Sequence, residues 1–325
     1  MSLVRAELQE AAGRAFGKGD LAPDRRKSWS LITDLGWLMA GVPEDLGGLG
    51  LDREATSVIH MELGRSLVPG PAIAQMMAIE ALCAADGVPE RDALLERAIG
   101  GEVMTVSLAG ASAAPLACVP DADHASHLLV LGDEKVALVQ PATATHRETW
   151  DKTRRLFDVT LTGAPELVLA EGEPARALFE RLQSLLLLAL AADSLGGAQA
   201  ALDLTVDYLK TRRQFGRPLA LFQALKHRVA DLRTWLSAAE ALFWTRAADP
   251  AATLTEMGAL KAHATSVYRQ ITEEAIQLHG GIGLTMEHTC HLFLKRAMLN
   301  AVLGGDADHW EEAAGRQALA LAASR

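Results

Sequence analysis

Four long segments with helical periodicity fill the second half of the chain, and they strongly limit the folds that it can adopt. Apolar residues recur every three to four positions in each segment, so each helix would have one face to bury. Helices of this length bury such faces best against one another when short connections join them. The pattern therefore predicts an antiparallel four-helix bundle over residues 174–325, with helices at residues 175–210, 222–247, 254–278 and 288–303.

The first part of the chain, residues 1–103, has the pattern of a separate helical domain. Residues 29–37 and 54–67 carry apolar residues at helical spacing, and the second of these segments ends before Pro69. The intervening sequence VPEDLGGLGLD, residues 42–52, combines a proline with glycines that do not fit inside a regular element. We therefore expect helices joined by an ordered loop in this region.

The middle of the chain, residues 104–173, changes from helical periodicity to short runs of strand-forming residues. Glycine, aspartate and proline separate these runs, as in a small antiparallel sheet or barrel. The expected fold is therefore mainly α with a small β domain between the two helical regions. The predicted strands lie at residues 104–108, 127–131, 135–139, 156–161 and 167–170.

Charge, cysteine content and hydropathy argue against several classes of protein. A net charge of −10, with basic residues dispersed along the chain, argues against binding to a nucleic-acid backbone. Cys83, Cys118 and Cys290 are far apart and lack CxxC spacing, which argues against a disulfide framework or a zinc site. The apolar run at residues 185–195 contains Asp193 and is too short to span a bilayer, so we expect a buried helix and no membrane contact. Because no signal-peptide pattern is present, we expect a soluble, cytoplasmic protein.

A cluster of cations marks the end of the first long helix, in the sequence YLKTRRQFGRPLALFQ. Lys210, Arg212 and Arg213 precede Phe215 and Gly216, so guanidinium groups that could bind a phosphate lie next to an aromatic ring. Gly216 is expected to form a turn before the next helix begins. The alternative is an ordinary basic helix end, which the helix dipole favours without any ligand.

A glycine-rich string, QLHGGIGLT, follows the third long helix and runs from Gln277 to Thr285. Glycines at this point leave the backbone uncovered, so a ligand could approach the main-chain amides. The alternative is a glycine that caps the helix before a flexible turn. The nearby His279, His288 and His291 match no common zinc spacing, so we expect packing and hydrogen bonding rather than a metal site.

Together, the segments RxQFGxPxxxxQ and QLHGGIGxTxE closely resemble the two FAD-binding signatures of the acyl-CoA dehydrogenase family. The sequences GW, VPEDLGGLGL and ELGRSL near the start of the chain resemble the opening domain of the same family. This resemblance implies the family's fold and its α,β-dehydrogenation of an acyl-CoA thioester. In that reaction a carboxylate removes a proton while FAD accepts a hydride. By the same resemblance, an electron-transfer flavoprotein is the expected electron acceptor.

The resemblance assigns two sets of residues to FAD. One set matches the family segment that contacts the pyrophosphate and adenine side of FAD, usually across a subunit boundary: Arg212, Gln214 and Phe215. The other set matches the segment that receives the neighbouring subunit's FAD: Gln277, Gly280 and Gly281. Because family members are usually dimers of dimers, a single chain is expected to hold incomplete sites.

Neither of the two positions at which the family usually carries its catalytic glutamate holds a carboxylate in this chain. Counting from Arg296 reaches Gly305, and counting back from Gly216 reaches Leu186. The family's flavin-contacting segments are also not recognisable in a middle domain that is expected to be reduced. These departures, with the endings HLFLKRA and LGGDADHW, resemble the short subunits of heterotetrameric acyl-CoA dehydrogenases of bacterial steroid side-chain degradation. On that basis a homologous partner chain would supply the glutamate.

Two alternatives to this half-site subunit remain open at the level of the sequence. The chain could be a self-sufficient, homo-oligomeric enzyme with a displaced base, either Asp306 beside the usual position or Asp193 on the apolar helix. It could instead be a non-catalytic scaffold that has kept the fold and lost the flavin. The acyl chain is not determined by these motifs, and a steroid side chain is implied only by the short-subunit resemblance.

Overall fold

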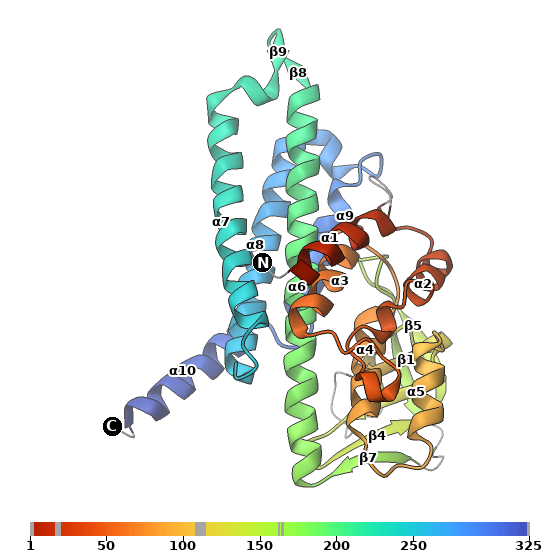
Figure 1. The fold of residues 1–325 in the computed structure, drawn as a ribbon. Coiled ribbons are helices and arrows are strands. Elements are labelled where there is room, and N and C mark those ends of the chain that lie inside the picture. Colours follow the sequence, from red (N-terminus) through yellow and green to blue (C-terminus); the bar gives the residue numbers. More distant parts are fainter. Residues whose placement is uncertain (1–2, 17–20, 108–114, 162, 164–165, 324–325) are drawn as a thin grey trace. The chain divides into compact units, whose positions relative to one another are not determined.

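The computed structural model describes residues 3–16, 21–107, 115–161, 163 and 166–323, and the chain forms two compact units (Figure 1). Neither unit is continuous in the sequence, because the chain passes from one unit to the other several times. Unit 1 contains residues 1–21, 57–67 and 187–325, and unit 2 contains residues 22–56 and 68–186. The helix α6 runs through the boundary, so its first part belongs to unit 2 and its second part to unit 1.

Unit 1 is built from helices, and the four long helices that the sequence predicts are confirmed. Their bounds differ from the predicted segments by only one or two residues at most ends. The helices are α1 (Leu3–Ala15), α3 (Arg53–Arg65), α6 (Glu173–Thr211), α7 (Gln223–Ala247), α8 (Leu254–His279), α9 (Cys290–Val302) and α10 (Ala307–Ala323). The short 3-10 helices η4 (Leu219–Leu221) and η5 (Gly280–Leu284) connect them.

The last helix, α10, is an element that the sequence pattern did not predict. Only Trp310 of this helix is buried, so α10 lacks the repeated apolar positions that reveal a core helix. Trp310 packs directly on Gly258 of α8, where a Cβ atom would lie 2.0 Å from the indole ring. One large side chain on one glycine therefore anchors α10, and periodicity cannot detect a contact of this kind.

The apolar run at residues 185–195 lies inside α6, a single helix of 39 residues. By length and composition α6 could cross a membrane, so the argument that the run is too short was wrong. However, 83% of the most apolar 18-residue window of α6 is buried inside the protein. Burial, and not length, favours the interpretation of α6 as a core helix.

Unit 2 contains the strands of the middle region, and here the expectation of one small antiparallel sheet or barrel was wrong in two respects. The strands form two sheets, and β1 (Met104–Ser107) pairs with β3 (His127–Leu131) in parallel. The first sheet has the order β1-β3-β4-β7, with β4 (Lys135–Val139) and β7 (Leu167–Glu171). The second has the order β2-β6-β5, with β2 (Leu116–Pro120), β6 (Leu156–Leu161) and β5 (Pro141–Arg147).

Two of these strands, β2 and β5, were not predicted from the sequence. β2 has a register irregularity and a left-handed residue, Cys118, with φ of 58°. β5 begins with a proline and is largely exposed, so it lacks an apolar face. β5 is therefore held by its pairing with β6, whereas β2 pairs with β6 and also places Leu116 and Val119 in the core.

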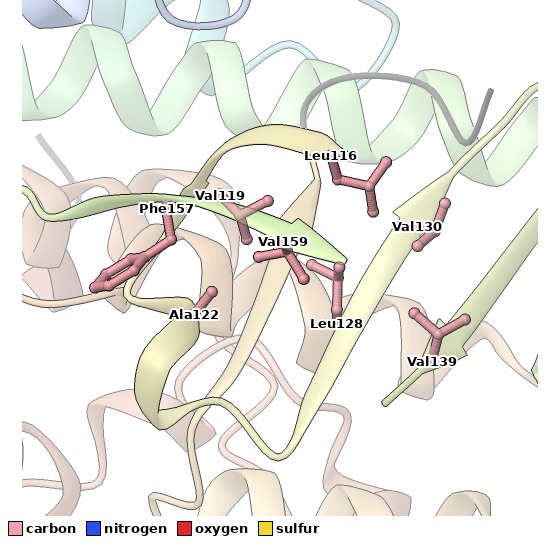
Figure 2. Packing of buried hydrophobic residues seen from close by; sticks show 8 residues of the cluster. All are labelled: Leu116, Val119, Ala122, Leu128, Val130, Val139, Phe157 and Val159. Atoms are coloured by element: carbon pink, nitrogen blue, oxygen red, sulfur yellow. The ribbon is translucent and has the colours of Figure 1, made fainter. Parts of the chain in front are cut away.

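Alternating side chains of the two sheets meet in one apolar cluster (Figure 2). The residues of one sheet point toward those of the other, as expected when two half-buried sheets pack face to face. The cluster consists of Leu128, Val130 and Val139 from the first sheet, Leu116, Val119, Phe157 and Val159 from the second, and Ala122 from η3 (Ala122–His124).

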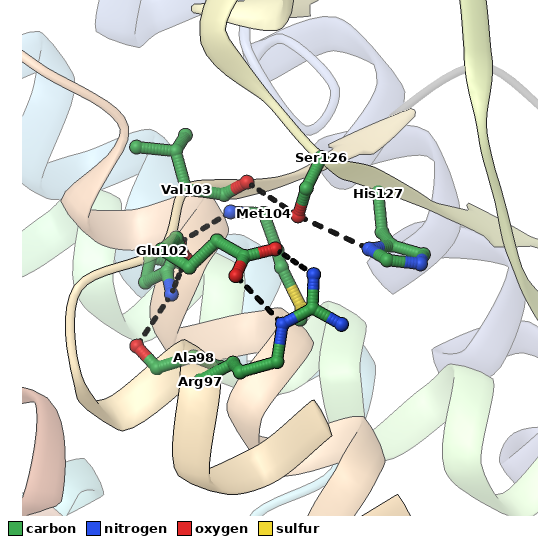
Figure 3. A network of polar contacts seen from close by, with 8 residues as sticks. Arg97, Ala98, Glu102, Val103, Met104, Ser126 and His127 are labelled. Carbon is green, nitrogen blue, oxygen red and sulfur yellow. Dashed lines mark hydrogen bonds and ion pairs between the residues drawn. The ribbon is translucent and has the colours of Figure 1, made fainter. Parts of the chain in front are cut away.

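The remaining helices of unit 2 are α2 (Arg25–Asp34), α4 (Ala72–Ala84) and α5 (Arg91–Ile99), with the 3-10 helices η1 (Trp37–Met39) and η2 (Glu44–Leu46). A buried glutamine on α4 fixes the corner between α5 and β1. The Gln75 amide donates hydrogen bonds to the carbonyls of Ala98 and Glu102 at 2.8 and 2.9 Å. Its carbonyl accepts one from the Met104 amide at 2.7 Å, at the start of β1. Figure 3 shows this corner, with Ala98, Glu102 and Met104 labelled. Helices thus change to strands at Met104 and return at Glu173.

Candidate cofactor site

The cationic cluster ends α6 in a tight hairpin, which Figure 1 shows between α6 and α7. Its two short strands are β8 (Arg213–Gln214) and β9 (Arg217–Pro218). The turn residues Phe215 and Gly216 both have positive φ, 51° and 75°, which is the conformation of a type I′ hairpin turn. Gly216 thus forms the expected turn.

The side chains that the resemblance assigns to FAD on this hairpin are all exposed. Arg212 and Gln214 are exposed, and the Phe215 ring is 89% exposed. Among the described residues, no carboxylate lies within ion-pair distance of the Arg212 guanidinium. A phenylalanine that is exposed and held at positive φ is unfavourable for an isolated chain, so its presence indicates a binding surface.

The glycine string forms an open turn at the end of α8. Gly280 has φ of 66° and ψ of −147°, a conformation that is almost restricted to glycine. A Cβ atom built on Gly280 or on Gly281 would meet nothing within 4 Å, so the backbone at this turn is uncovered. Gln277 is exposed, as are the following Leu284 and Met286, at 76% and 82%.

The structure brings the two predicted FAD segments together in unit 1 through a residue whose role the sequence did not reveal. Tyr208, on the last turn of α6, donates a hydrogen bond from its hydroxyl to the His279 carbonyl at 3.2 Å. The two rings are stacked, with centroids 4.4 Å apart and an interplanar angle of 27°. Tyr208 precedes Arg212, and His279 precedes Gly280, so this contact joins the ends of both segments.

His279 belongs to a group with His288 and Cys290 in which one donor atom of each residue lies within 4.8 Å of the others. The His279 Nδ1 atom lies 2.7 Å from the Ala275 carbonyl, and the Cys290 amide donates to His288 Nδ1 at 3.2 Å. Burial raises the pKa of the Cys290 thiol to about 12 and lowers the pKa of both imidazoles. The Nδ1 atoms of both histidines are thus engaged in hydrogen bonds, and the Cys290 thiol is protonated at neutral pH.

Gly305, the position at which the family resemblance places the catalytic glutamate, is surrounded by structural contacts. Its carbonyl accepts a hydrogen bond at 2.6 Å from the buried Lys261 ammonium, which also donates to the Ala301 carbonyl at 2.8 Å. Gly305 has φ of 93°, and a Cβ atom there would lie 2.8 Å from Trp310 Nε1 and 2.9 Å from His309 Cδ2. A larger residue at this position would therefore require the loop to move.

The other positions considered for a base have structural roles. Leu186, at the second position where the resemblance places a glutamate, is a buried apolar residue of α6. Asp306 is exposed, and its carboxylate accepts a hydrogen bond from the His309 amide at 3.0 Å. The Asp306 carbonyl also accepts a bond from the Trp310 amide, so Asp306 caps the N-terminus of α10. This arrangement favours the capping role over that of a displaced base.

The second displaced-base candidate, Asp193, is engaged in a buried ion pair. Its Oδ1 atom accepts hydrogen bonds from Arg296 Nε at 3.1 Å and from Asn300 Nδ2 at 2.7 Å. The second carboxylate oxygen pairs with the Arg296 guanidinium. Such bidentate pairing gives both carboxylate oxygens a hydrogen-bond donor. Asp193 therefore joins α6 to α9, and the hypothesis of a free base at this position is not supported.

A cavity of about 790 Å³ in unit 1 contains an acidic residue that the sequence analysis did not identify. It is lined mainly by α1, α3 and α6, and burial raises the pKa of Glu62 within it. Glu62 lies on the apolar face of α3, and a carboxylate at such a position is the sequence feature that could have identified it. None of the residues assigned to FAD lines this cavity, so Glu62 is not placed beside the predicted cofactor segments.

Comparison with known proteins agrees with this geometry. Residues 2–101 match the N-terminal domain of acyl-CoA dehydrogenases, and residues 187–319 match the C-terminal domain. Acyl-CoA dehydrogenase IpdE2 of Mycobacterium tuberculosis is 34% identical over 305 residues, which cover 93% of this chain and 89% of IpdE2.

Two solved structures have the same fold over nearly the whole chain. The Tcur3481–Tcur3483 steroid ACAD is 26% identical with a TM-score of 0.86, and the match covers 98% of each chain. The ChsE4–ChsE5 complex from Mycobacterium tuberculosis is 21% identical with a TM-score of 0.85, again over 98% of each chain.

The chain therefore belongs to the acyl-CoA dehydrogenase family. Members of this family are FAD-dependent oxidoreductases that act on the CH–CH group of acyl-CoA. The fold expected from the two cofactor motifs, with helical regions on either side of a small β region, is confirmed.

Proposed function

We propose that this chain is the base-lacking, FAD-binding subunit of a heteromeric acyl-CoA dehydrogenase, and that a homologous partner chain supplies the catalytic carboxylate. The observation that carries this proposal is the closed position at Gly305. Trp310 and His309 occupy the space where a side chain at Gly305 would begin, and Lys261 holds the Gly305 carbonyl, while the backbone at Gly280 and Gly281 remains open. The chain thus retains a surface for the cofactor and has lost the place for the base.

The residues of both open segments fit FAD. The Arg212 guanidinium suits the diphosphate because it is a charged, forked donor without a competing carboxylate among the described residues. The exposed Phe215 ring offers an apolar plane, and the uncovered turn at Gly280 and Gly281 offers main-chain amides. Gln277 adds an exposed amide side chain at the same turn. FAD, when bound, supplies the hydride acceptor of the dehydrogenation.

The identity of the partner and substrate is proposed from the relatives. The names Tcur3481–Tcur3483 and ChsE4–ChsE5 each denote two components, which supports a heteromeric assembly for this chain. The first of these structures is described as a steroid ACAD, which supports a CoA thioester with a steroid side chain as substrate. We place the reaction in the cytoplasm, with an electron-transfer flavoprotein as electron acceptor.

Coexpression with the homologous partner chain tests the proposal. The visible spectrum, native mass and acyl-CoA dehydrogenation are measured for this chain alone, for the partner alone and for both together. We expect bound flavin and turnover only in the joint complex, and turnover there should be abolished when the partner's candidate glutamate is changed to glutamine. A homo-oligomer of this chain that dehydrogenates acyl-CoA on its own would contradict the proposal. A joint complex that binds no FAD would instead support the scaffold alternative.

A further inference from the structure

We infer that Tyr208 is a positioning residue that holds the open glycine turn in place relative to the Arg212 hairpin. This inference rests on the proposed binding of FAD to these two segments. Its basis is the contact between Tyr208 and His279, which are 71 positions apart in the sequence. Tyr208 lies just before Arg212, and His279 lies just before Gly280. The Tyr208 hydroxyl bonds to the glycine turn through the His279 carbonyl, and the Tyr208 main-chain carbonyl bonds to the hairpin through the Arg212 amide.

The main-chain carbonyl of Tyr208 fixes the start of the hairpin. It accepts a hydrogen bond from the Arg212 amide at 2.8 Å and another from the Thr211 hydroxyl at 3.1 Å. The Arg212 carbonyl in turn accepts a bond from the Leu219 amide at 2.9 Å, which closes the hairpin at its base. Tyr208 therefore lies one helical turn before the hairpin and is bonded directly to its first residues.

The side chain of Tyr208 fixes the end of α8. Carbonyl groups in the last turn of a helix have no partner within the helix, so they need a donor from elsewhere. The Tyr208 hydroxyl provides this donor to the His279 carbonyl, and its ring stacks on the imidazole. The His288 ring contacts both of these rings, with its centroid 4.4 Å from that of His279 and 6.0 Å from that of Tyr208.

The position of His279 controls the cofactor turn because Gly280 follows it directly. The peptide that carries the His279 carbonyl also carries the Gly280 amide, and the two groups are held in one plane. A Cβ atom on Gly280 would meet nothing within 4 Å, so no side chain covers the outer side of the turn. The Gly280 amide donates to the Gln277 carbonyl within α8, and the hydrogen bond from Tyr208 links the same peptide to α6, from which the hairpin begins.

Variants of Tyr208 separate this positioning role from simple packing. Tyr208→Phe keeps the stacked ring and removes the hydroxyl, whereas Tyr208→Leu removes both. Tyr268→Phe is a matched control, because Tyr268 is the only other tyrosine and lies fully buried in the middle of α8. All are prepared as complexes with the homologous partner. The FAD dissociation constant and the melting temperature are measured for each complex, and hydrogen exchange of the main-chain amides is measured without FAD.

We expect Tyr208→Phe to weaken FAD binding about five-fold, the usual effect of one lost hydrogen bond, with a melting temperature close to that of the wild type. Amide exchange should increase at residues 280–284 and stay unchanged at residues 213–218. Tyr268→Phe should leave both the FAD dissociation constant and the exchange at residues 280–284 unchanged.

Wild-type affinity and exchange in Tyr208→Phe, with losses only in Tyr208→Leu, would overturn the inference and leave ring packing as the role of Tyr208. A wild-type complex that binds no FAD would refute the proposed function itself. In that case unchanged exchange at residues 280–284 in Tyr208→Phe would also overturn the positioning role.

Discussion

Single residues around the α9–α10 loop show how a catalytic position can become a structural one. Asp306 is next to the usual site of the glutamate, yet its carboxylate caps α10. Lys261 is fully buried and binds two carbonyl groups of the loop, including that of Gly305. Each of these polar side chains has partners that account for its position without a substrate.

Asp306 is predicted to contribute to stability and not to catalysis. Asparagine caps helices as well as aspartate does, so Asp306→Asn should leave stability nearly unchanged, whereas Asp306→Ala should cost about 1 kcal/mol. Both variants of the complex should dehydrogenate acyl-CoA at the wild-type rate. Urea unfolding and turnover measurements check the two statements, and a large loss of turnover in Asp306→Asn would restore Asp306 as a displaced base.

Lys261 is predicted to make stability increase at alkaline pH. Burial lowers the pKa of its ammonium group from 10.5 to about 8, although the nearby Asp306 carboxylate opposes this shift. The folded protein therefore releases this proton near pH 8, while the unfolded chain keeps it until about pH 10.4. Between these values the unfolded state binds more protons, so the free energy of unfolding increases with pH, by a total of about 3 kcal/mol.

The contribution of Lys261 is measured as the difference between wild type and Lys261→Met in urea unfolding from pH 7 to 10.5. Lys261→Met should lack the increase, although it should be less stable at pH 10.5 because two carbonyl groups lose their donor. Lys226→Met, on the exposed surface of α7, serves as the control and should keep the wild-type slope. Identical slopes in wild type and Lys261→Met would show that the folded and unfolded chains bind this proton equally.

At the scale of elements, the connection between α9 and α10 is held from two sides. Trp310 anchors α10 on α8 and donates from its indole to the Gly304 carbonyl at 3.0 Å, while Lys261 on α8 binds Gly305. The connection therefore contacts α8 through Ala301, which precedes Gly304 and Gly305, and through Trp310, which follows them. The junction at which the family resemblance places the catalytic base is thus held by structural contacts in this chain.

Gly305→Glu is predicted to destabilise the chain without giving it activity. The added Cβ atom would lie below 3 Å from Trp310 and His309, and a non-glycine residue at φ of 93° is strained in addition. We expect a loss of about 2–4 kcal/mol in urea unfolding, with Gly305→Ala showing most of this loss. Dehydrogenation by the isolated Gly305→Glu chain would contradict the view that this position is closed.

At the scale of the whole molecule, residues that are unfavourable for an isolated chain gather at the two proposed FAD segments. Phe215 is held at positive φ and is almost fully exposed, and Leu284 and Met286 are also exposed at the glycine turn. Within the chain Phe215 contacts the Phe222 ring edge-on, at a centroid distance of 6.1 Å, and leaves most of its surface exposed. Conflicts of this kind are expected at functional sites, where a bound molecule covers the residues.

Phe215→Asn should therefore separate folding from function. Asparagine adopts positive φ more readily than phenylalanine, so the isolated chain should be as stable as the wild type or slightly more stable. The complex with the homologous partner should bind FAD more weakly, because the apolar plane is lost. Thermal unfolding and the FAD dissociation constant report the two effects, and wild-type FAD affinity would exclude a role for Phe215 in the cofactor site.

Periodicity and composition predicted the long helices and most of the strands because these signals are local. A helix with apolar residues on one face, such as residues 254–278, can be recognised without knowledge of its neighbours. The absence of a carboxylate at Gly305 and Leu186 is likewise a property of the sequence itself. The family and its cofactor motifs could also be identified from residues that lie close together along the chain.

The tertiary structure decided the features that depend on distant residues. It pairs Asp193 with Arg296 and Tyr208 with His279, and no local pattern distinguishes these side chains from exposed or unpaired ones. It also turned Asp306 into a helix cap, because the anchoring of α10 depends on a contact between Trp310 and α8. The sequence sets which surfaces must be buried, but packing selects which partner buries each one, and that selection fixed the charge, exposure and role of the candidate residues.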